Sequence, residues 1–371
     1  MKLKKSTKFM FIIWGILIII NLLAKVFHGA VDFYIAHIFP CISSIWSHIS
    51  NIFPFSLGEW MIFAGIVLIV VGLISFIGFM IFAKGRRKKI AGIYGQICGW
   101  ILTWLFTVVT SRFFVLYQGT QLSQTIETEI ATKDILKVYQ MLVDGANRES
   151  ALIARDEDGY FVMTDNLMSE AKECMSRLSQ TYPQYGGWYP NAKPIYHSYF
   201  FSQQNLLGIY YPFSMEANYN PVVYPVNLPV TICHEFTHLK GNIFEDEAGY
   251  YAFLACMTSD SADFRYSAYI SALEWFEPHF EDDETAWEKY FEISAQILPE
   301  VDRDMYTFVP EDYWEEHKEK EEFIPTDVVS QTADVVMDTS LKVNGVIEGS
   351  HSYHGMTALL MHYYLEGDTL Q

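Results

Sequence analysis

Residues 228–241 have the sequence LPVTICHEFTHLKG, and this stretch predicts a buried helix with two histidines on one face. Proline is common in the first turn of a helix and glycine just past its end, so Pro229 and Gly241 bracket a helix from Val230 to Lys240. The residues flanking the histidines are apolar and compatible with a helix. We therefore expect this helix to lie inside a folded domain.

The two histidines of this helix are candidate metal ligands. His234 and His238 are four residues apart, so both imidazoles project from the same face and can bind one ion. Glu235 is turned by about 100° from His234, where its carboxylate can act as a general base on a water molecule held by the metal. This pattern is the one that zinc peptidases use. A surface helix that carries these residues by chance is the alternative.

A catalytic zinc ion needs a third protein ligand and one position open for water. The candidates are Glu245, Asp246 and Glu247, which open a second helical run. Acidic residues at a helix start also cap the helix and stabilise its dipole, so part of this cluster is expected to be structural. Glu247 shares a helical phase with Tyr251 and Leu254, a face with apolar character, and we therefore predict Glu247 as the ligand. Its two neighbours suit capping better.

Catalysis by such a site needs groups beyond the metal ligands. The metal would lower the pKa of its bound water toward roughly 7, and Glu235 could take the proton during attack on a carbonyl group. The resulting oxyanion needs a hydrogen-bond donor, and Tyr353 and His354 are candidates because they precede an apolar helical run at 356–365. A structural role at that helix start is the alternative.

A short strand is predicted at 206–211, within a segment rich in Tyr, Pro, Gly and Asn. An edge strand beside the metal could pair with an extended substrate backbone, a recognition mode that peptidases often use. Packing of its aromatic residues against a membrane domain is the alternative.

Three apolar segments near the N-terminus predict transmembrane helices at about 9–27, 60–83 and 90–116. Each is long enough to cross a hydrocarbon core of about 30 Å. Buried core helices of a soluble protein are the alternative, but core helices of this length without a charge are rare. The chain is therefore divided into a membrane domain at 1–117 and an outer domain at 118–371.

Charge separates these two parts. Residues 1–117 hold 11 of the 25 Lys and Arg residues and only 2 of the 44 Asp and Glu residues, which leaves 14 basic and 42 acidic residues for 118–371. An acidic domain repels a phosphate backbone, so nucleic acid is excluded as a partner. The positive-inside rule places the basic loop 84–89 and the Lys-rich N-terminus in the cytoplasm, and residues from 118 onward outside the cell membrane.

Two further features concern the segment 28–59 and the cysteines. The segment 28–59 joins the first two predicted spans and is rich in aromatic residues, which predicts either an interfacial helix or a lid against the outer domain. The five cysteines show no Cys-x-x-Cys spacing, so no disulfide framework is expected.

Several short motifs spread over most of the chain resemble those of domain-of-unknown-function family 3810, bacterial membrane proteins regarded as candidate zinc-dependent peptidases. The resemblance implies the zinc-binding helix pair of glutamate-ligand (gluzincin-like) metallopeptidases, with Glu247 as third ligand. The chain departs from the family pattern at Leu239-Lys240, where a more polar pair is usual, and at His354, which intervenes between Tyr353 and Gly355. The motifs are Pro54-Phe55-Ser56, Tyr211-Pro212-Phe213, Glu216-Ala217-Asn218, Leu228-Pro229, Gly241, Glu245-Asp246-Glu247-Ala248, Phe264-Arg265-Tyr266-Ser267 and Ser352-Tyr353.

The sequence therefore predicts a membrane-anchored, mainly α protein, with three N-terminal transmembrane helices followed by a zincin-like, mostly helical α+β catalytic domain with a small sheet. One Zn²⁺ on His234, His238 and Glu247 would support hydrolysis of extracytoplasmic or membrane-proximal polypeptides. The expected partners are the lipid bilayer and the polypeptide substrate. The alternative is a non-catalytic membrane sensor or scaffold with a structural or vestigial zinc site. An intramembrane protease fits poorly, because the histidine helix lies in the acidic part of the chain.

Overall fold

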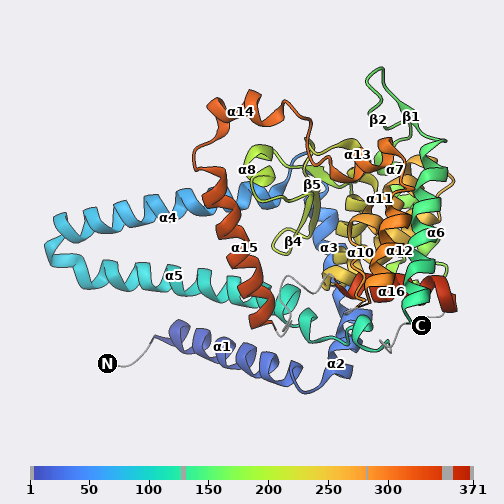
Figure 1. Ribbon diagram of the computed structural model, residues 1–371. Coiled ribbons are helices and arrows are strands. Elements are labelled where there is room, and N and C mark those ends of the chain that lie inside the picture. The colour runs from blue at the N-terminus through green and yellow to red at the C-terminus, as the bar shows by residue number, and fades with distance from the viewer. Residues whose placement is uncertain (1–3, 127–130, 281–282, 345–353, 368–371) are drawn as a thin grey trace.

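The computed structural model describes residues 4–126, 131–280, 283–344 and 354–367, and it is mostly helical (Figure 1). Three helical segments are long and apolar enough to cross a membrane: α1 (Lys5–Ala24), α4 (Leu57–Phe82) and the run Lys84–Gln118, which contains α5 (Arg87–Val109). The predicted three apolar segments are thereby confirmed as helices.

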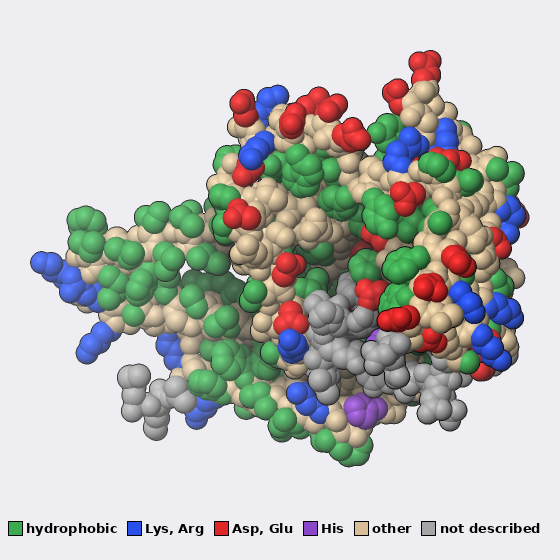
Figure 2. Space-filling view, in the orientation of Figure 1, with side chains coloured by type: hydrophobic (Ala, Val, Ile, Leu, Met, Phe, Trp, Pro, Cys, Tyr) green, Lys and Arg blue, Asp and Glu red, His purple; other side chains and the backbone are tan. Residues whose placement is uncertain are grey.

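The helices α4 and α5 project from the body of the protein as a hairpin. Figure 2 shows hydrophobic side chains along both helices and Lys and Arg side chains at their far tip, where the basic loop 84–89 joins them. The most apolar window of α4 has no buried residue, and Leu68 on it is 69% exposed. A helix that is apolar all round and exposed in this way needs a lipid environment.

The segment between the first two spans is helical and packs into the body. It forms α2 (His28–Phe33), the π-helical turn η1 (Tyr34–Ile38) and α3 (Phe39–Ser50). The phenyl ring of Phe39 is fully buried in the main hydrophobic core. On the next turns, Ser43 Oγ donates to Leu239 O at 2.6 Å and Ser47 Oγ donates to Met215 O at 2.9 Å. This segment is therefore part of the core of the body.

The body is a cluster of helices around α9 (Leu228–Leu239) and α10 (Glu245–Met257), which pack against each other and against α11 (Ala262–Glu274). The helices α6 (Thr132–Ser150), α7 (Leu167–Leu178) and α16 (His354–Glu366) cover this centre. The other helices and the 3₁₀ turns are α8 (Ser198–Ser202), α12 (Glu284–Ser294), α13 (Pro299–Tyr306), α14 (Tyr313–Glu321), α15 (Thr326–Val343), η2 (Lys84–Arg86), η4 (Leu116–Gln118), η5 (Leu122–Gln124), η6 (Pro183–Tyr185) and η7 (Pro225–Asn227), and a π-helical turn η3 (Thr110–Phe114) interrupts the third span.

A small sheet lies beside α9. Its strands are β3 (Lys193–Pro194), β4 (Gly208–Tyr211) and β5 (Glu216–Tyr219), in the order β3-β5-β4, with β3 parallel and β4 antiparallel to β5. The strand predicted at 206–211 is thereby confirmed as β4, which lies at the edge of the sheet.

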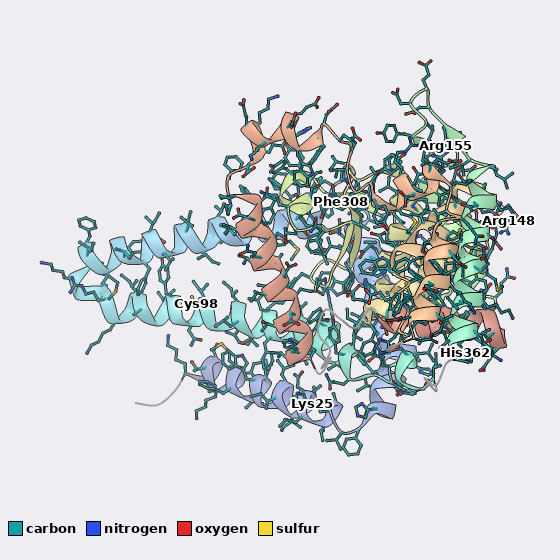
Figure 3. All side chains as sticks on the ribbon, viewed as in Figure 1. Lys25, Cys98, Arg148, Arg155, Phe308 and His362 are labelled. Carbon is teal, nitrogen blue, oxygen red and sulfur yellow. The ribbon has the colours of Figure 1, made fainter. Side chains whose placement is uncertain are left out.

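A second, two-stranded hairpin surrounds the polar turn at 156–159. It consists of β1 (Ala154–Arg155) and β2 (Phe161–Val162). Arg155, labelled in Figure 3, donates to the buried Asp304 of α13 at 2.9 Å and so ties this hairpin to the helical core.

The start of α4 is bound to the sheet through one buried carboxylate. Glu216 on β5 accepts hydrogen bonds from the amides of Leu57 at 3.1 Å and Gly58 at 2.7 Å. The same carboxylate pairs with the buried ammonium group of Lys193 on β3. Because a buried charge needs close partners, this cluster fixes the second span to the sheet.

The third span is bound to the turn between β4 and β5. Arg112 donates to the carbonyl oxygens of Pro212 at 3.1 Å and Phe213 at 3.2 Å, and its guanidinium lies 4.6 Å from the ring centroid of Trp46. Trp104 of α5 contacts the ring of Phe213, with centroids 5.7 Å apart. The turn after β4 is thus held against the third span, while β5 is held against the second.

Candidate metal centre

The helix predicted from the sequence is present as α9, and its end is sharply defined. Gly241 adopts φ of +99°, a conformation that glycine accepts without strain and that commonly ends a helix. A Cβ at this position would also lie 2.9 Å from the ring of Phe39 on α3. The chain therefore turns within a few residues and returns as α10, whose first residue, Glu245, lies beside the last turns of α9.

Three side chains meet at this corner. The Nε2 atoms of His234 and His238 are 3.0 Å apart, and Oε2 of Glu245 lies 3.0 Å from His234 Nε2 and 3.7 Å from His238 Nε2. The ligand atoms of these three side chains all lie within 4.8 Å of one another. Among the described residues, this is the cluster of His, Cys, Asp or Glu side chains that could hold a metal ion.

The orientation of His238 is fixed by a hydrogen bond on the other side of its ring. Its Nδ1 lies 2.7 Å from the carbonyl oxygen of Asn242, which can only accept a hydrogen bond. Nδ1 therefore carries the proton, and a neutral His238 presents the lone pair of Nε2 toward His234 and Glu245. This is the arrangement in which metal-binding histidines are usually held.

The donor set fits zinc. Zinc takes imidazole nitrogens and carboxylate oxygens at about 2.0–2.2 Å in a tetrahedral arrangement, which separates the ligand atoms from one another by roughly 3.3 Å. The three separations in this group bracket that value. Two histidines and one carboxylate also match the ligand number of catalytic rather than structural zinc sites.

The pKa values of these groups depend on one another. Burial lowers the pKa of His238, but the charge of Glu245 and its hydrogen bond outweigh this effect and raise the pKa to about 9. Burial lowers the pKa of His234 below its usual value. Burial would raise the pKa of Glu245, but the two histidines together hold it well below its usual value. Glu245 is therefore an anion that the two imidazoles face.

Glu235 lies in the same region but is not part of the group of three. Its side chain is buried, and Oε2 has no hydrogen-bond partner among the described residues. Burial raises its pKa to about 8, with a smaller opposing effect from His238. Its carboxylate lies against the backbone of β4, because a Cβ at Gly208 would be 2.6 Å from Oε1. An unpartnered buried carboxylate beside two histidines and an edge strand is available to accept a proton from a bound molecule.

Glu247, the predicted third ligand, does not join the two histidines in the structure; Glu245 does. The two glutamates are two positions apart, or about 200° around the helix, so they face opposite sides of α10. Glu247 accepts hydrogen bonds from the amide of Leu122 and from Nδ2 of Asn242. Burial raises its pKa to about 8. Glu247 thus supports Asn242, whose carbonyl orients His238.

No sequence pattern pointed to Asn242, and the apolar face of α10 favoured Glu247, whereas Glu245 is the glutamate that lies beside the two histidines. The useful signal is the length of the link at 240–244 between the two helices. So short a connection places the first residue of the second helix beside the last turn of the first.

Of the two predicted oxyanion donors, Tyr353 and His354, the structure describes only the backbone position of His354. Tyr353 lies outside the described residues. His354 is the first residue of α16, and the start of this helix lies close to Asp246, since a Cβ at Gly355 would meet that carboxylate.

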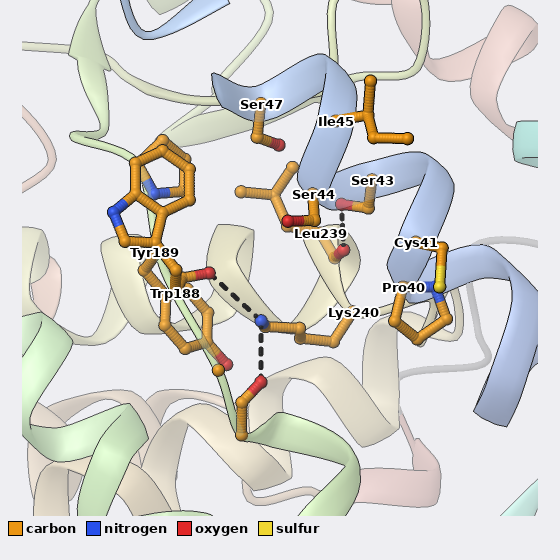
Figure 4. A pocket seen from close by; sticks show the side chains of 13 residues that line it. Pro40, Cys41, Ser43, Ser44, Ile45, Ser47, Trp188, Tyr189, Leu239 and Lys240 are labelled. Carbon is orange, nitrogen blue, oxygen red and sulfur yellow. Dashed lines mark hydrogen bonds between the residues drawn. The ribbon is translucent and has the colours of Figure 1, made fainter. Parts of the chain in front are cut away.

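A pocket of about 430 Å³ lies at the C-terminal end of α9, between α3 and the segment 186–190 (Figure 4). Nζ of Lys240 donates to the carbonyl oxygens of Gly186 at 2.9 Å and Trp188 at 3.3 Å, and lies 4.1 Å from the ring centroid of Tyr189. Burial lowers the pKa of Lys240 to about 8. Neither His234 nor His238 lines this pocket, so it is separate from the metal centre.

A family model described as a protein of unknown function (DUF3810) matches residues 34–361, which include every residue of the candidate metal centre. No curated protein and no solved structure matches the chain.

Proposed function

Because the chain belongs to the family DUF3810, whose function is unknown, we propose its activity from its own residues: it is a membrane-anchored zinc metallopeptidase that hydrolyses extracytoplasmic or membrane-proximal polypeptides. The observation that carries this proposal is the convergence of His234, His238 and Glu245, with the unpartnered carboxylate of Glu235 beside them. The body of the protein would then be a zincin-like domain.

The metal ligands in this proposal are His234, His238 and Glu245. A zinc ion held by them would supply a Lewis acid that activates water for attack on a peptide carbonyl. Three protein ligands leave a fourth position for water or substrate, whereas a structural site usually fills it with another side chain. This difference favours an enzyme over a sensor or scaffold.

Glu235 acts as the general base. A metal ion held by His234, His238 and Glu245 would favour the ionised form of this buried carboxyl group, which is the form that accepts a proton. Once protonated, the same carboxyl group can return the proton to the leaving amine. Glu235 has the freedom for this role because no described side chain occupies Oε2.

The edge strand β4 supports a polypeptide as the substrate. Its residue Gly208 lies against Glu235, so a peptide that pairs with β4 in an extended conformation passes beside the base. Main-chain pairing of this kind recognises polypeptides without requiring a particular side chain at each position.

The basic tip of α4 and α5 supports the proposed orientation of the domain. Lys and Arg side chains gather there, at the end of the hairpin far from the body (Figure 2). The positive-inside rule assigns that tip to the cytoplasm, which leaves the body on the outer side of the cell membrane.

The activity is tested by metal analysis of the purified full-length protein followed by cleavage of a peptide library. We expect about one zinc per chain in the wild type and in Glu235→Gln, loss of zinc in His238→Ala, and cleavage by the wild type alone. Zinc content that survives His238→Ala overturns the metal assignment. Equal cleavage by wild type and Glu235→Gln overturns the assignment of the base. Zinc binding without cleavage of any peptide favours the sensor or scaffold.

A further inference from the structure

The helix α15 runs across the base of the membrane helices. Its C-terminal end is tied to the third span, where Nε2 of Gln118, the last residue of that span, donates to the carbonyl oxygen of Asn344 at 3.0 Å. At its other end, Nε2 of Gln203 donates to Ile324 O at 2.9 Å and to Thr326 Oγ1 at 3.0 Å. Both ends of α15 are therefore held to the rest of the protein by side-chain hydrogen bonds.

The second of these contacts leads to the start of α4. Gln203 directly follows α8, and the residues just before α8 bind the second span: the amides of Tyr196 and His197 donate to the carboxylate of Glu59 at 2.9 and 2.8 Å. One end of α15 is thus connected to the outer end of α4 and the other to the outer end of the third span. Figure 1 shows α15 crossing the direction of α4 and α5 where these helices leave the body.

The side chains of α15 divide into three sectors at about 100° per residue. One sector faces the protein and contains the buried Val329 and Leu341. The exposed half divides in two. A polar flank and an apolar flank run side by side along the helix. The polar flank consists of Asp327, Gln331, Asp334, Asp338 and Lys342, and the apolar flank of Val328, Thr332, Val335, Val336, Thr339 and Val343.

The apolar flank is widely exposed. Val335, Val336 and Val343 are 65%, 62% and 65% exposed, and Phe323 just before the helix is 92% exposed. Single exposed apolar residues are ordinary, but four exposed valines on one side of a helix, with two threonines between them and a charged flank beside them, mark a surface that another apolar phase covers.

We propose that α15 is a membrane-surface helix whose apolar flank enters the boundary between headgroups and acyl chains of the bilayer that α4 and α5 cross. A helix that lies in the interface has this division into a buried apolar side and a hydrated polar side. The position of α15 between the outer ends of two spans places it at that boundary. The polar flank holds three Asp and one Lys, so apolar burial rather than attraction to anionic lipid drives the contact.

This inference does not depend on the zinc chemistry. It gives the body a second attachment to the bilayer, across the direction of the spans (Figure 1).

The test is spin-label accessibility in the full-length protein reconstituted into phosphatidylcholine vesicles. The exposed Cys41 and Cys98 are first replaced by serine, since both would react with the label. Labels are then attached at Val335→Cys on the apolar flank and, as a matched control, at Asp334→Cys, which lies about 100° around the helix on the polar flank. Both positions are exposed in the structure, so neither label disturbs the core.

We expect the label at position 335 to collide more with oxygen than with a water-soluble nickel chelate, by a several-fold higher ratio than at position 334. A second label at Val343→Cys should behave like the one at 335. Equal access of the chelate to both flanks overturns the proposal, because the apolar flank would then be in water. Protection of 335 from both reagents together with spin coupling between labels also overturns it, since a second copy of the chain would then cover the flank.

Discussion

Gly208 on the edge strand lies directly against Glu235: a Cβ at position 208 would be 2.6 Å from Oε1 and 2.9 Å from Cγ of that glutamate. The strand can come this close to the carboxylate only because residue 208 has no side chain. The position of the proposed base and the position of the proposed substrate strand are therefore set by one glycine.

Gly208→Ala tests this relationship. The added methyl group must displace Glu235, Thr231 or the strand, and a shift of about 1 Å at a reacting group can lower activity by on the order of 100-fold. We expect peptide cleavage to fall by that order while zinc content stays at the wild-type level. Gly29→Ala is the matched control, because nothing lies within 4 Å of a Cβ there. Unchanged cleavage in Gly208→Ala would show that the position of Glu235 does not matter for the reaction, and would contradict its role as the base.

The third ligand is tested by comparing Glu245→Gln with Glu247→Gln. Glu245 faces both histidines, so its replacement should remove zinc from the protein during dialysis. Glu247 acts through Asn242, and groups that orient a ligand typically contribute about 10- to 100-fold in metal affinity. Because its raised pKa leaves Glu247 largely protonated at neutral pH, glutamine is a close substitute, and we expect the lower end of that range. Zinc titration measures the affinity of each variant. A larger loss of zinc affinity in Glu247→Gln than in Glu245→Gln would restore Glu247 as the ligand.

The raised pKa of Glu235 makes the stability of the metal-free protein depend on pH. Its pKa is about 8 in the folded protein against 4.5 for an ordinary glutamate, so between these values the folded state binds more protons than the unfolded state. Stability then falls as the pH rises through this window, and the loss is complete above about pH 8. Glutamine does not titrate, so Glu235→Gln should be more stable than the wild type near pH 7, by on the order of 2–3 kcal/mol.

Thermal unfolding of both proteins in detergent with a chelator, at several pH values from 4.5 to 8, measures this difference. The two stabilities should converge toward pH 4.5. Parallel curves would show that Glu235 is not buried as a charged group.

The buried pair of Lys193 and Glu216 is expected to hold the second span against the sheet. Lys193→Met leaves the carboxylate of Glu216 buried without its counter-charge, which typically costs about 3–5 kcal/mol. Thermal unfolding in detergent should detect this loss. The double variant Lys193→Met, Glu216→Gln should recover part of it, because the amide carries no charge. A single variant as stable as the wild type would show that the amides of Leu57 and Gly58 alone satisfy Glu216.

The elements that could be predicted from the sequence are those with a strong local pattern. The three apolar segments, the helix with His234 and His238, and the cap at Gly241 follow from length, periodicity and backbone preference, and all are present in the structure. The strand at 206–211 is also present, because its residues favour extended structure between turn-forming neighbours.

The choice between Glu245 and Glu247 could not be made from the same patterns. The prediction relied on an apolar face of the second helix, but α10 is buried on nearly all sides, and Ala248 and Tyr250 are as buried as Leu254. A helix that is apolar all round has no face that points to the core, so its periodicity carries no information about the metal. The role of Asn242 depends on a backbone carbonyl, which no side-chain pattern reveals.

The helix α3 lies between the first two spans in the chain but inside the body in space. Ser43 and Ser47 bind backbone oxygens at the end of α9 and in the turn after β4, and Phe39 fills the core beside Gly241. A fragment that begins after the third span would therefore lack one wall of its own interior. Cleavage between the third span and the body would leave this wall behind with the membrane helices, so the body can complete its core only together with the segment between the first two spans.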